Sequence, residues 1–183
     1  MQTKSLFLSL ASTLAAATLF GLSTTAAIET QVIDQPKNET QAVQEAVDRF
    51  YASLNTLFGG DATAMEQVWS HADDITYMGP VGGYQVGWKQ VQAVWEQQAA
   101  MKLGGKVEPM ATRITLGGEL ASVQCLEVGN NMTADGQAEK VSIRATSLFR
   151  KEEGQWKMIS HHTDVLPYLE TETDAVLKQL KSE

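Results

Sequence analysis

Two adjacent histidines stand near the end of the chain, in the stretch from Trp156 to Asp164 that reads WKMISHHTD. Imidazole changes charge near neutral pH, so a histidine in a pocket can accept or release a proton. The alternation of apolar and polar residues predicts a strand, and neighbouring side chains on a strand point to opposite faces. We therefore expect only one of His161 and His162 to line a pocket. The structural alternative is a hydrogen-bonded histidine that finishes the strand.

Arg144 and Glu127 are the next candidates for polar chemistry. Arg144 lies between two apolar residues in a strand-like run, residues 141–151, and a buried arginine can bind a carboxylate through two parallel hydrogen bonds. The structural alternative pairs Arg144 with Glu127 across neighbouring strands. If Glu127 points inward, it is the best carboxylate base in the chain. Cys125 shares its strand face and is interpreted as a small core residue.

Aromatic residues offer walls for a pocket. Tyr77, Trp88 and Trp95, together with Met78, would suit a flat or apolar ligand, and Tyr77 adds a phenol donor. The same residue types would also serve as an ordinary hydrophobic core. The sequence leaves both interpretations open.

Metal and cofactor sites are not expected. His71 would have to join His161 and His162, but ligands next to each other on a strand diverge. The single Cys125 cannot build a thiolate zinc site. The chain has no glycine-rich phosphate loop, G-x-S-x-G elbow or H-E-x-x-H motif. We therefore predict no metal and no cofactor.

The amino terminus predicts export. Lys4 precedes an apolar stretch, residues 6–22, and small residues lead up to Ala27, which indicates a signal peptide of residues 1–27. An uncleaved anchor is the alternative. Cleavage would leave a periplasmic or secreted protein. The full chain carries a net charge of −8, and removing Lys4 gives 13 − 22 = −9. That charge argues against nucleic acid or an anionic membrane as partner.

The remaining pattern predicts one domain of α+β type, residues 38–168, between a disordered leader, residues 28–37, and a tail, residues 169–183, that includes a loose helix. Apolar periodicity and glycine stops predict three helices, and alternation between turn signals predicts six strands in a largely antiparallel sheet. The expected helices are 38–58, 61–71 and 89–102, and the expected strands are 75–78, 84–87, 107–116, 120–130, 141–151 and 156–164.

This order resembles the nuclear transport factor 2-like (cystatin-like) cone fold, most closely its SnoaL-like and ketosteroid-isomerase-like branch. The resemblance implies three N-terminal helices packed on a curved, mostly antiparallel sheet. In that branch the last strand carries W-x-hydrophobic-hydrophobic-x-x-H-x-S, so His162 matches the histidine and Asp164 replaces the usual serine. The stretches that carry the resemblance are Phe50–Tyr51 with Gly60–Asp61, Ala72–Pro80, Gly83 with Val86–Lys89 and Val91, and Trp156–Asp164.

The resemblance also implies a type of chemistry. Isomerases of this kind use a carboxylate base inside the cone, with acidic hydrogen-bond donors opposite it. No residue here matches that base by position, so the isomerase activity is not carried over. The fold hosts enzymes, binding modules and oligomerisation domains.

Two functions follow as hypotheses. The first is an exported domain that binds a small apolar or aromatic molecule in the cone, with or without cofactor-free acid–base activity of the isomerase, dehydratase or hydrolase type. The second is a non-catalytic dimerisation or protein-binding module whose pocket is filled by its own side chains. In either case we expect a homodimer through the outer sheet face, because Val141, Ile143 and similar residues on that face would need cover.

Overall fold

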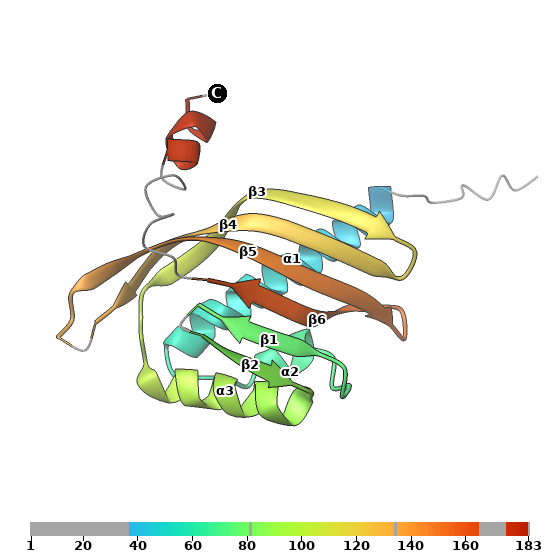
Figure 1. Ribbon diagram of the computed structural model, residues 1–183, viewed down its shortest axis with the longest axis horizontal. Coiled ribbons are helices and arrows are strands. Elements are labelled where there is room, and N and C mark those ends of the chain that lie inside the picture. Colours follow the sequence, from blue (N-terminus) through green and yellow to red (C-terminus); the bar gives the residue numbers. More distant parts are fainter. Residues whose placement is uncertain (1–36, 81, 134, 165–174, 183) are drawn as a thin grey trace, which may run out of the picture. The chain divides into compact units, whose positions relative to one another are not determined.

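The computed structural model describes residues 37–80, 82–133, 135–164 and 175–182 (Figure 1). The predicted signal peptide, residues 1–27, and residues 28–36 of the predicted leader lie outside the described residues, as does the start of the predicted tail. Within the described part of the chain, no helix is long and apolar enough to cross a membrane.

Three helices occupy the places that the sequence predicts. They are α1 (Lys37–Phe58), α2 (Met65–Val68) and α3 (Trp88–Met101), and residues 175–180 form a further short helix. The second helix was expected to reach His71 but ends at Val68. The reason is that Trp69 forms a parallel bridge with Met158, and the Ser70 N–H donates to the Met158 carbonyl. The chain thus leaves the helix to join the sheet.

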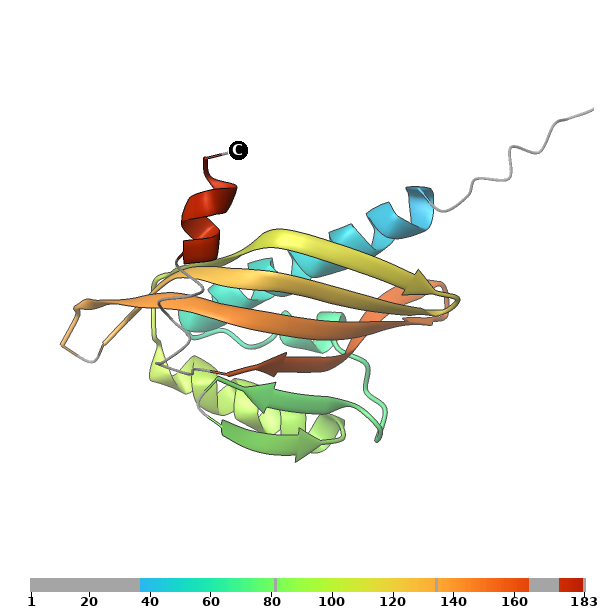
Figure 2. The ribbon, with the colours of Figure 1, turned by 45° about the horizontal axis from the view of Figure 1, so that its top comes forward.

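One six-stranded sheet holds the rest of the domain, with the strand order β2-β1-β6-β5-β4-β3. Every neighbouring pair is antiparallel except β1 and β6, which run parallel. This arrangement confirms the predicted α+β class with a curved, mostly antiparallel sheet (Figure 2). The strands are β1 (Thr76–Gly79), β2 (Gly82–Val86), β3 (Lys106–Gly117), β4 (Leu120–Met132), β5 (Ala138–Glu152) and β6 (Gln155–Thr163).

The apolar face of α1 packs across one face of the sheet (Figures 1 and 2). Its buried residues recur at three- and four-residue steps, as the sequence predicts, and they include Val43, Val47, Phe50 and Leu54. Asn55 adds a polar clamp. Its side-chain amide donates to the Val107 carbonyl at 2.9 Å, and its side-chain oxygen accepts from the Val107 N–H at 2.8 Å. The helix is thereby fixed to the start of β3.

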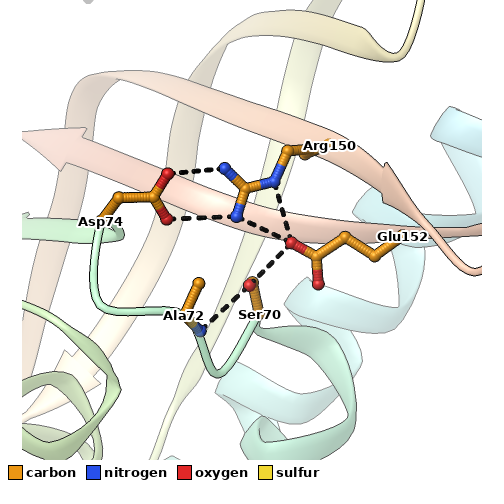
Figure 3. A network of polar contacts seen from close by, with 5 residues as sticks. All are labelled: Ser70, Ala72, Asp74, Arg150 and Glu152. Carbon is orange, nitrogen blue, oxygen red and sulfur yellow. Dashed lines mark hydrogen bonds and ion pairs between the residues drawn. The ribbon is translucent and has the colours of Figure 1, made fainter.

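A charged network anchors the segment that leads into β1 (Figure 3). The Arg150 guanidinium on β5 donates to both oxygens of Asp74, at 2.7 and 3.1 Å, and its Nε donates to Glu152 at 2.9 Å. Glu152 also accepts from Ser70 at 2.8 Å, and Ser70 accepts from the Ala72 N–H. Asp74, although largely exposed, is thus one arm of a bidentate ion pair.

Candidate functional site

A cavity of about 400 Å³ lies between the helices and the inner face of the sheet. Most of its wall is apolar, with Leu54 and Phe58 from α1, Trp95 from α3 and Val107 from β3 among the lining residues. Polar residues interrupt that wall. Asn131, Glu139, Lys140 and Ser142 are among them, and the others are Tyr77 on β1, Gln98 on α3, Glu127 on β4, and His161 and Thr163 on β6. An apolar hollow with a few polar groups is the usual form of a small-molecule site.

Glu127 and His161 meet across an intervening strand. Both are buried, with side-chain exposures of 6% and 4%, and His161 Nε2 lies 3.4 Å from Glu127 Oε1. The strand between them is β5, and Ala145 is paired there with Cys125 on one side and Thr163 on the other. Ala145 lies between Ile143, which is paired with Glu127, and Ser147, which is paired with His161, so a small side chain at this position is compatible with the approach of the carboxylate to the imidazole.

Hydrogen bonds fix the orientation of both groups. His161 Nδ1 lies 2.8 Å from the Ser147 hydroxyl, and Tyr51 donates to Glu127 Oε1 at 2.8 Å. If Ser147 donates to Nδ1, then Nε2 carries the proton and faces the carboxylate favourably. Among the described residues, both contacts of the Glu127 carboxylate go to Oε1 and none to Oε2, and Glu127 lines the cavity. The pair therefore combines a positioned imidazole with an acceptor oxygen.

Tyr77 supplies a donor in the same cavity. Gln98 donates to the Tyr77 hydroxyl at 3.0 Å, so the Tyr77 proton is free to point at a ligand oxygen. Burial raises the pKa of Tyr77 to about 12, so the phenol keeps its proton at neutral pH. Gly79 makes room for this ring, because a Cβ there would lie 2.5 Å from the Tyr77 hydroxyl oxygen.

Tyr51 and Cys125 close the network on the α1 side. The Tyr51 hydroxyl lies 3.2 Å from Cys125 Sγ as well as within bonding distance of Glu127. Burial, followed by the nearby Glu127 carboxylate, raises the Tyr51 pKa far above its ordinary value. Burial raises the pKa of Cys125 to about 11, so its thiol stays protonated at neutral pH. Cys125 therefore fits the small core residue that the sequence suggested rather than a nucleophile.

The two histidines point to opposite faces, as strand geometry requires. His161 is buried and lines the cavity, whereas His162 lies on the outer face, where its Nε2 is 2.8 Å from the exposed Asp164 carboxylate. The histidine that matches the family pattern is therefore not the one in the cavity. Met78, paired with His162 across β1 and β6, also faces away from the cavity wall.

Arg144 lies on the outer face too. It is exposed and lies opposite Leu126, so it does not pair with Glu127, whose partner across the ladder is Ile143. Arg144 lines an outer groove of about 560 Å³ instead. Val141 and Ile143, expected on the outer face, line the cavity, because they share the face of Glu127. A homodimer was expected because Val141 and Ile143 would need cover on the outer face, and that reason does not hold for these two residues.

Of the three aromatic residues predicted for the wall, Tyr77 and Trp95 line the cavity and Trp88 does not. Trp88 is half-buried and stacks on His71, with ring centroids 4.3 Å apart, at a separate surface pocket beside α2. His71 therefore lies away from His161 and His162. Within the described residues, no group of three or more His, Cys, Asp or Glu side chains is arranged to hold a metal ion.

Four residues of the site were missed from the sequence: Tyr51, Gln98, Ser147 and Thr163. Tyr51 follows Val47 and precedes Leu54 at helical steps, so it falls on the buried stripe of α1. Ser147 and Thr163 occupy the same alternating positions as Ala145 and His161. For these residues the available signal was a polar side chain at a position where the pattern of the strand or helix places apolar residues toward the core. Gln98 carries no such signal.

Comparisons with known proteins agree with the fold described above. The family model of the SnoaL-like domain matches residues 43–167. A proposed dehydratase of the nuclear transport factor 2-like family from Streptomyces avermitilis is 19% identical, with a TM-score of 0.66, over 73% of this chain and 99% of that one. The comparison with curated proteins found no match.

Two further solved structures share the fold. A nuclear transport factor 2-like superfamily protein from Salmonella enterica is 18% identical, with a TM-score of 0.61, over 69% of this chain and 90% of that one. A proposed ketosteroid isomerase from Shewanella frigidimarina is 18% identical, with a TM-score of 0.55, over 67% and 94%. At these identities the likeness shows the fold alone.

Proposed function

The chain belongs to the SnoaL-like domain family, and we propose that it binds a small, uncharged, largely apolar molecule in the cavity and transfers a proton of that molecule through Glu127. The observation that carries this proposal is the buried carboxylate that lines a largely apolar cavity: among the described residues, Oε1 takes both protein contacts and Oε2 takes none. A carboxylate in such a place is suited to accept a proton.

The other polar groups have complementary roles in this proposal. Tyr77 donates a hydrogen bond to a ligand oxygen, on which negative charge develops as Glu127 accepts the proton. His161, held by Ser147, places an N–H beside Glu127 Oε1 and stabilises the ionised carboxylate. No step requires a metal or a cofactor. Proton transfer of this kind serves an isomerase or a dehydratase equally.

A hydrolase of the serine type is disfavoured. Ser147, His161 and Glu127 form a Ser–His–carboxylate series, but Ser147 is not among the residues that line the cavity. A nucleophile must reach the substrate carbonyl. Ser147 is therefore a positioning residue that sets the histidine tautomer.

An uncharged ligand is favoured over a carboxylic acid. Arg144, which was to bind a carboxylate, lies outside the cavity, and the lining residue with a permanent positive charge is the exposed Lys140. An anionic ligand would meet Glu127, and no buried cation among the described lining residues would balance the two charges. Steroid-like or polyketide-like ring systems with few charges fit this description.

The test is proton exchange on a simple ketone. We use 2-tetralone, an uncharged bicyclic ketone with acidic α-protons, and follow their replacement by deuterium in D₂O by NMR. Wild type is expected to accelerate the exchange, and Glu127→Gln should lower that acceleration by at least about 100-fold, because a general base contributes about 10²–10⁴. Glu152→Gln, the same change in the surface network, should keep it. Equal exchange by wild type and Glu127→Gln would overturn the role of Glu127.

The homodimer is a separate proposal. The outer groove of about 560 Å³ lies between β3 to β6 and the C-terminal helix, whose Val176 and Leu180 line it, and Leu148 on β5 is 40% exposed. A second copy could cover both. Sedimentation at high concentration would show a dimer, and a monomer there would count against it.

A non-catalytic module whose pocket is filled by its own side chains is not favoured, because the cavity has room for a ligand. Export through residues 1–27 likewise stays a proposal.

A further inference from the structure

The outer face of the sheet carries a row of polar side chains that the proposed function does not use. Arg113 on β3, Gln124 on β4, Thr146 on β5 and His162 on β6 are paired, each with the next, across the four strands. Side chains at paired positions lie on the same face of a sheet. All four line the outer groove of about 560 Å³, and so does Arg144, two residues before Thr146. The groove therefore has a floor with several basic groups.

The two arginines of this floor have no carboxylate partner among the described residues. Both are exposed, and the Arg113 guanidinium donates to the carbonyl of its own neighbour, Thr112, at 3.4 Å. Arg150 in the surface network, by contrast, is paired with two carboxylates. The described residues of the groove include one carboxylate, Asp164, in a chain with 22 acidic and 14 basic residues. The groove thus has the opposite sign of charge to the chain as a whole, which favours an anion.

The C-terminal helix, residues 175–180, supplies an apolar wall to the same groove. Val176 and Leu180 line the groove, and they are 47% and 37% exposed. Residues four apart lie on the same side of a helix, so these two side chains form one stripe. Leu126 on β4, which is half-buried, adds apolar surface to the floor. A basic floor beside an apolar wall suits a ligand that has both characters.

We propose that this groove binds an amphipathic anion, a small molecule with one carboxylate and an apolar chain. Arg144 and Arg113 bind the carboxylate, because a guanidinium matches its geometry with two parallel hydrogen bonds. The chain lies along Val176 and Leu180. The groove is on the opposite face of the sheet from Glu127, so this inference does not depend on the proposed function.

A second copy of the chain suits the floor of the groove less well. A twofold interface uses the same patch on both copies, so it would bring the positive grooves of the two copies together. An anion bound in the groove neutralises Arg113 and Arg144. The ligand is therefore compatible with a homodimer that covers the rest of this face.

Calorimetric titration of the protein with three probes tests the proposal. Octanoate has both the carboxylate and the chain, propionate has the carboxylate alone, and 1-octanol has the chain alone. Octanoate should bind wild type at least about tenfold more tightly than either of the others, because the charge-assisted hydrogen bonds and the burial of the chain both contribute. Failure of octanoate to bind, or equal affinity for octanoate and 1-octanol, would overturn the proposal.

Two variants separate the contributions to octanoate binding. Arg144→Gln should raise the Kd about tenfold by removing a charged partner, and Leu180→Ser should raise it about threefold to fivefold by removing apolar surface. Arg49→Gln, at an exposed position on α1, is the matched control and should leave the Kd unchanged. An unchanged Kd in Arg144→Gln would show that the basic floor is not the binding site.

The histidine ring signals in NMR spectra locate the probe. His162 lines the groove and His161 lines the cavity, and each signal is identified by its loss in the corresponding Gln variant. Octanoate should shift the His162 signal and leave the His161 signal in place. A shift of His161 alone would place the probe in the cavity and overturn the groove site. Loss of a dimer in Arg144→Gln with unchanged octanoate binding would assign the groove to a second copy instead.

Discussion

Two polar networks on the same sheet differ in what they leave unpaired. The surface network lies at the C-terminal end of β5 and consists of Arg150, Asp74, Glu152 and Ser70 (Figure 3). Each of its charged groups is paired with an opposite charge. The buried network around Glu127 and His161 borders a cavity, and among the described residues both contacts of the Glu127 carboxylate go to Oε1 and none to Oε2. A network that serves the fold satisfies its own members. One that leaves polar atoms facing a cavity is arranged for something that enters it.

The largest effect is expected from filling the space above Ala145. Ala145→Leu would push a branched side chain between Glu127 and His161, because Ala145 lies on the strand between them. Binding of 2-tetralone should weaken at least tenfold, and overpacking should cost about 1–3 kcal/mol of stability. Calorimetry and thermal unfolding measure the two effects. Ala138→Leu, at the exposed start of β5, is the matched control.

Unchanged binding in Ala145→Leu would contradict the difference between the two networks, because it would show that the buried network does not border the ligand.

A smaller effect is expected at Gly79. An alanine Cβ there would lie 2.5 Å from the Tyr77 hydroxyl oxygen, so the phenol must move away from Gln98. We expect exchange of 2-tetralone to fall about tenfold, in line with the loss of one well-placed donor of about 1.4 kcal/mol. Gly117→Ala, where the new Cβ meets nothing closer than 4.0 Å, should leave exchange unchanged. Equal effects of the two variants would contradict the role of Tyr77.

The surface network should affect stability but not exchange. Arg150→Met leaves Asp74 and Glu152 without their cation and should cost about 1 kcal/mol at pH 7, since the pair is partly exposed. Hydrogen bonds from Arg150 lower the Asp74 pKa below its ordinary value. Because the Asp74 pKa is lower in the folded protein than in the unfolded chain, the ion pair stabilises the fold fully at a pH above the pKa of unfolded Asp, about 3.9. This stabilisation is lost as the pH falls through the pKa of Asp74 in the folded protein.

The difference between Arg150→Met and wild type should therefore shrink below about pH 4 and in high salt. Thermal unfolding at several pH values measures it, with the exposed Arg113→Met as control. A stability difference that stays constant down to pH 2 would show that Arg150 acts through packing rather than charge.

The sequence predicted the elements better than the site. Helical periodicity and turn residues placed α1, α3 and all six strands to within a few residues, because these signals are local. Alternation showed that His161 and His162 face opposite ways, but the inner face depends on pairing with β1 and β5, which the sequence does not state. The approach of Glu127 to His161 depends on the register of three strands at once.

Arg144 shows where a local signal was misread. Its apolar neighbours on either side were taken as burial of Arg144 itself. In a strand that faces the core on one side, alternation instead assigns Ile143 and Ala145 to the inner face and Arg144 to the outer one. The same rule applied to Tyr77 separates it from Met78. The inward register of Ser147 and Thr163 could have been read in this way too.

The most direct test of the difference between the networks is thermal unfolding of Glu127→Gln beside Glu152→Gln. Gln at 127 can still accept the Tyr51 hydrogen bond, and it removes the cost of a buried charge. We predict that Glu127→Gln melts at or above the wild-type temperature. Glu152→Gln should melt below it, because it should lose about 0.5 kcal/mol of the free energy of unfolding. If Glu127→Gln is destabilised more than Glu152→Gln, the buried network holds the fold, and its assignment to a ligand is wrong.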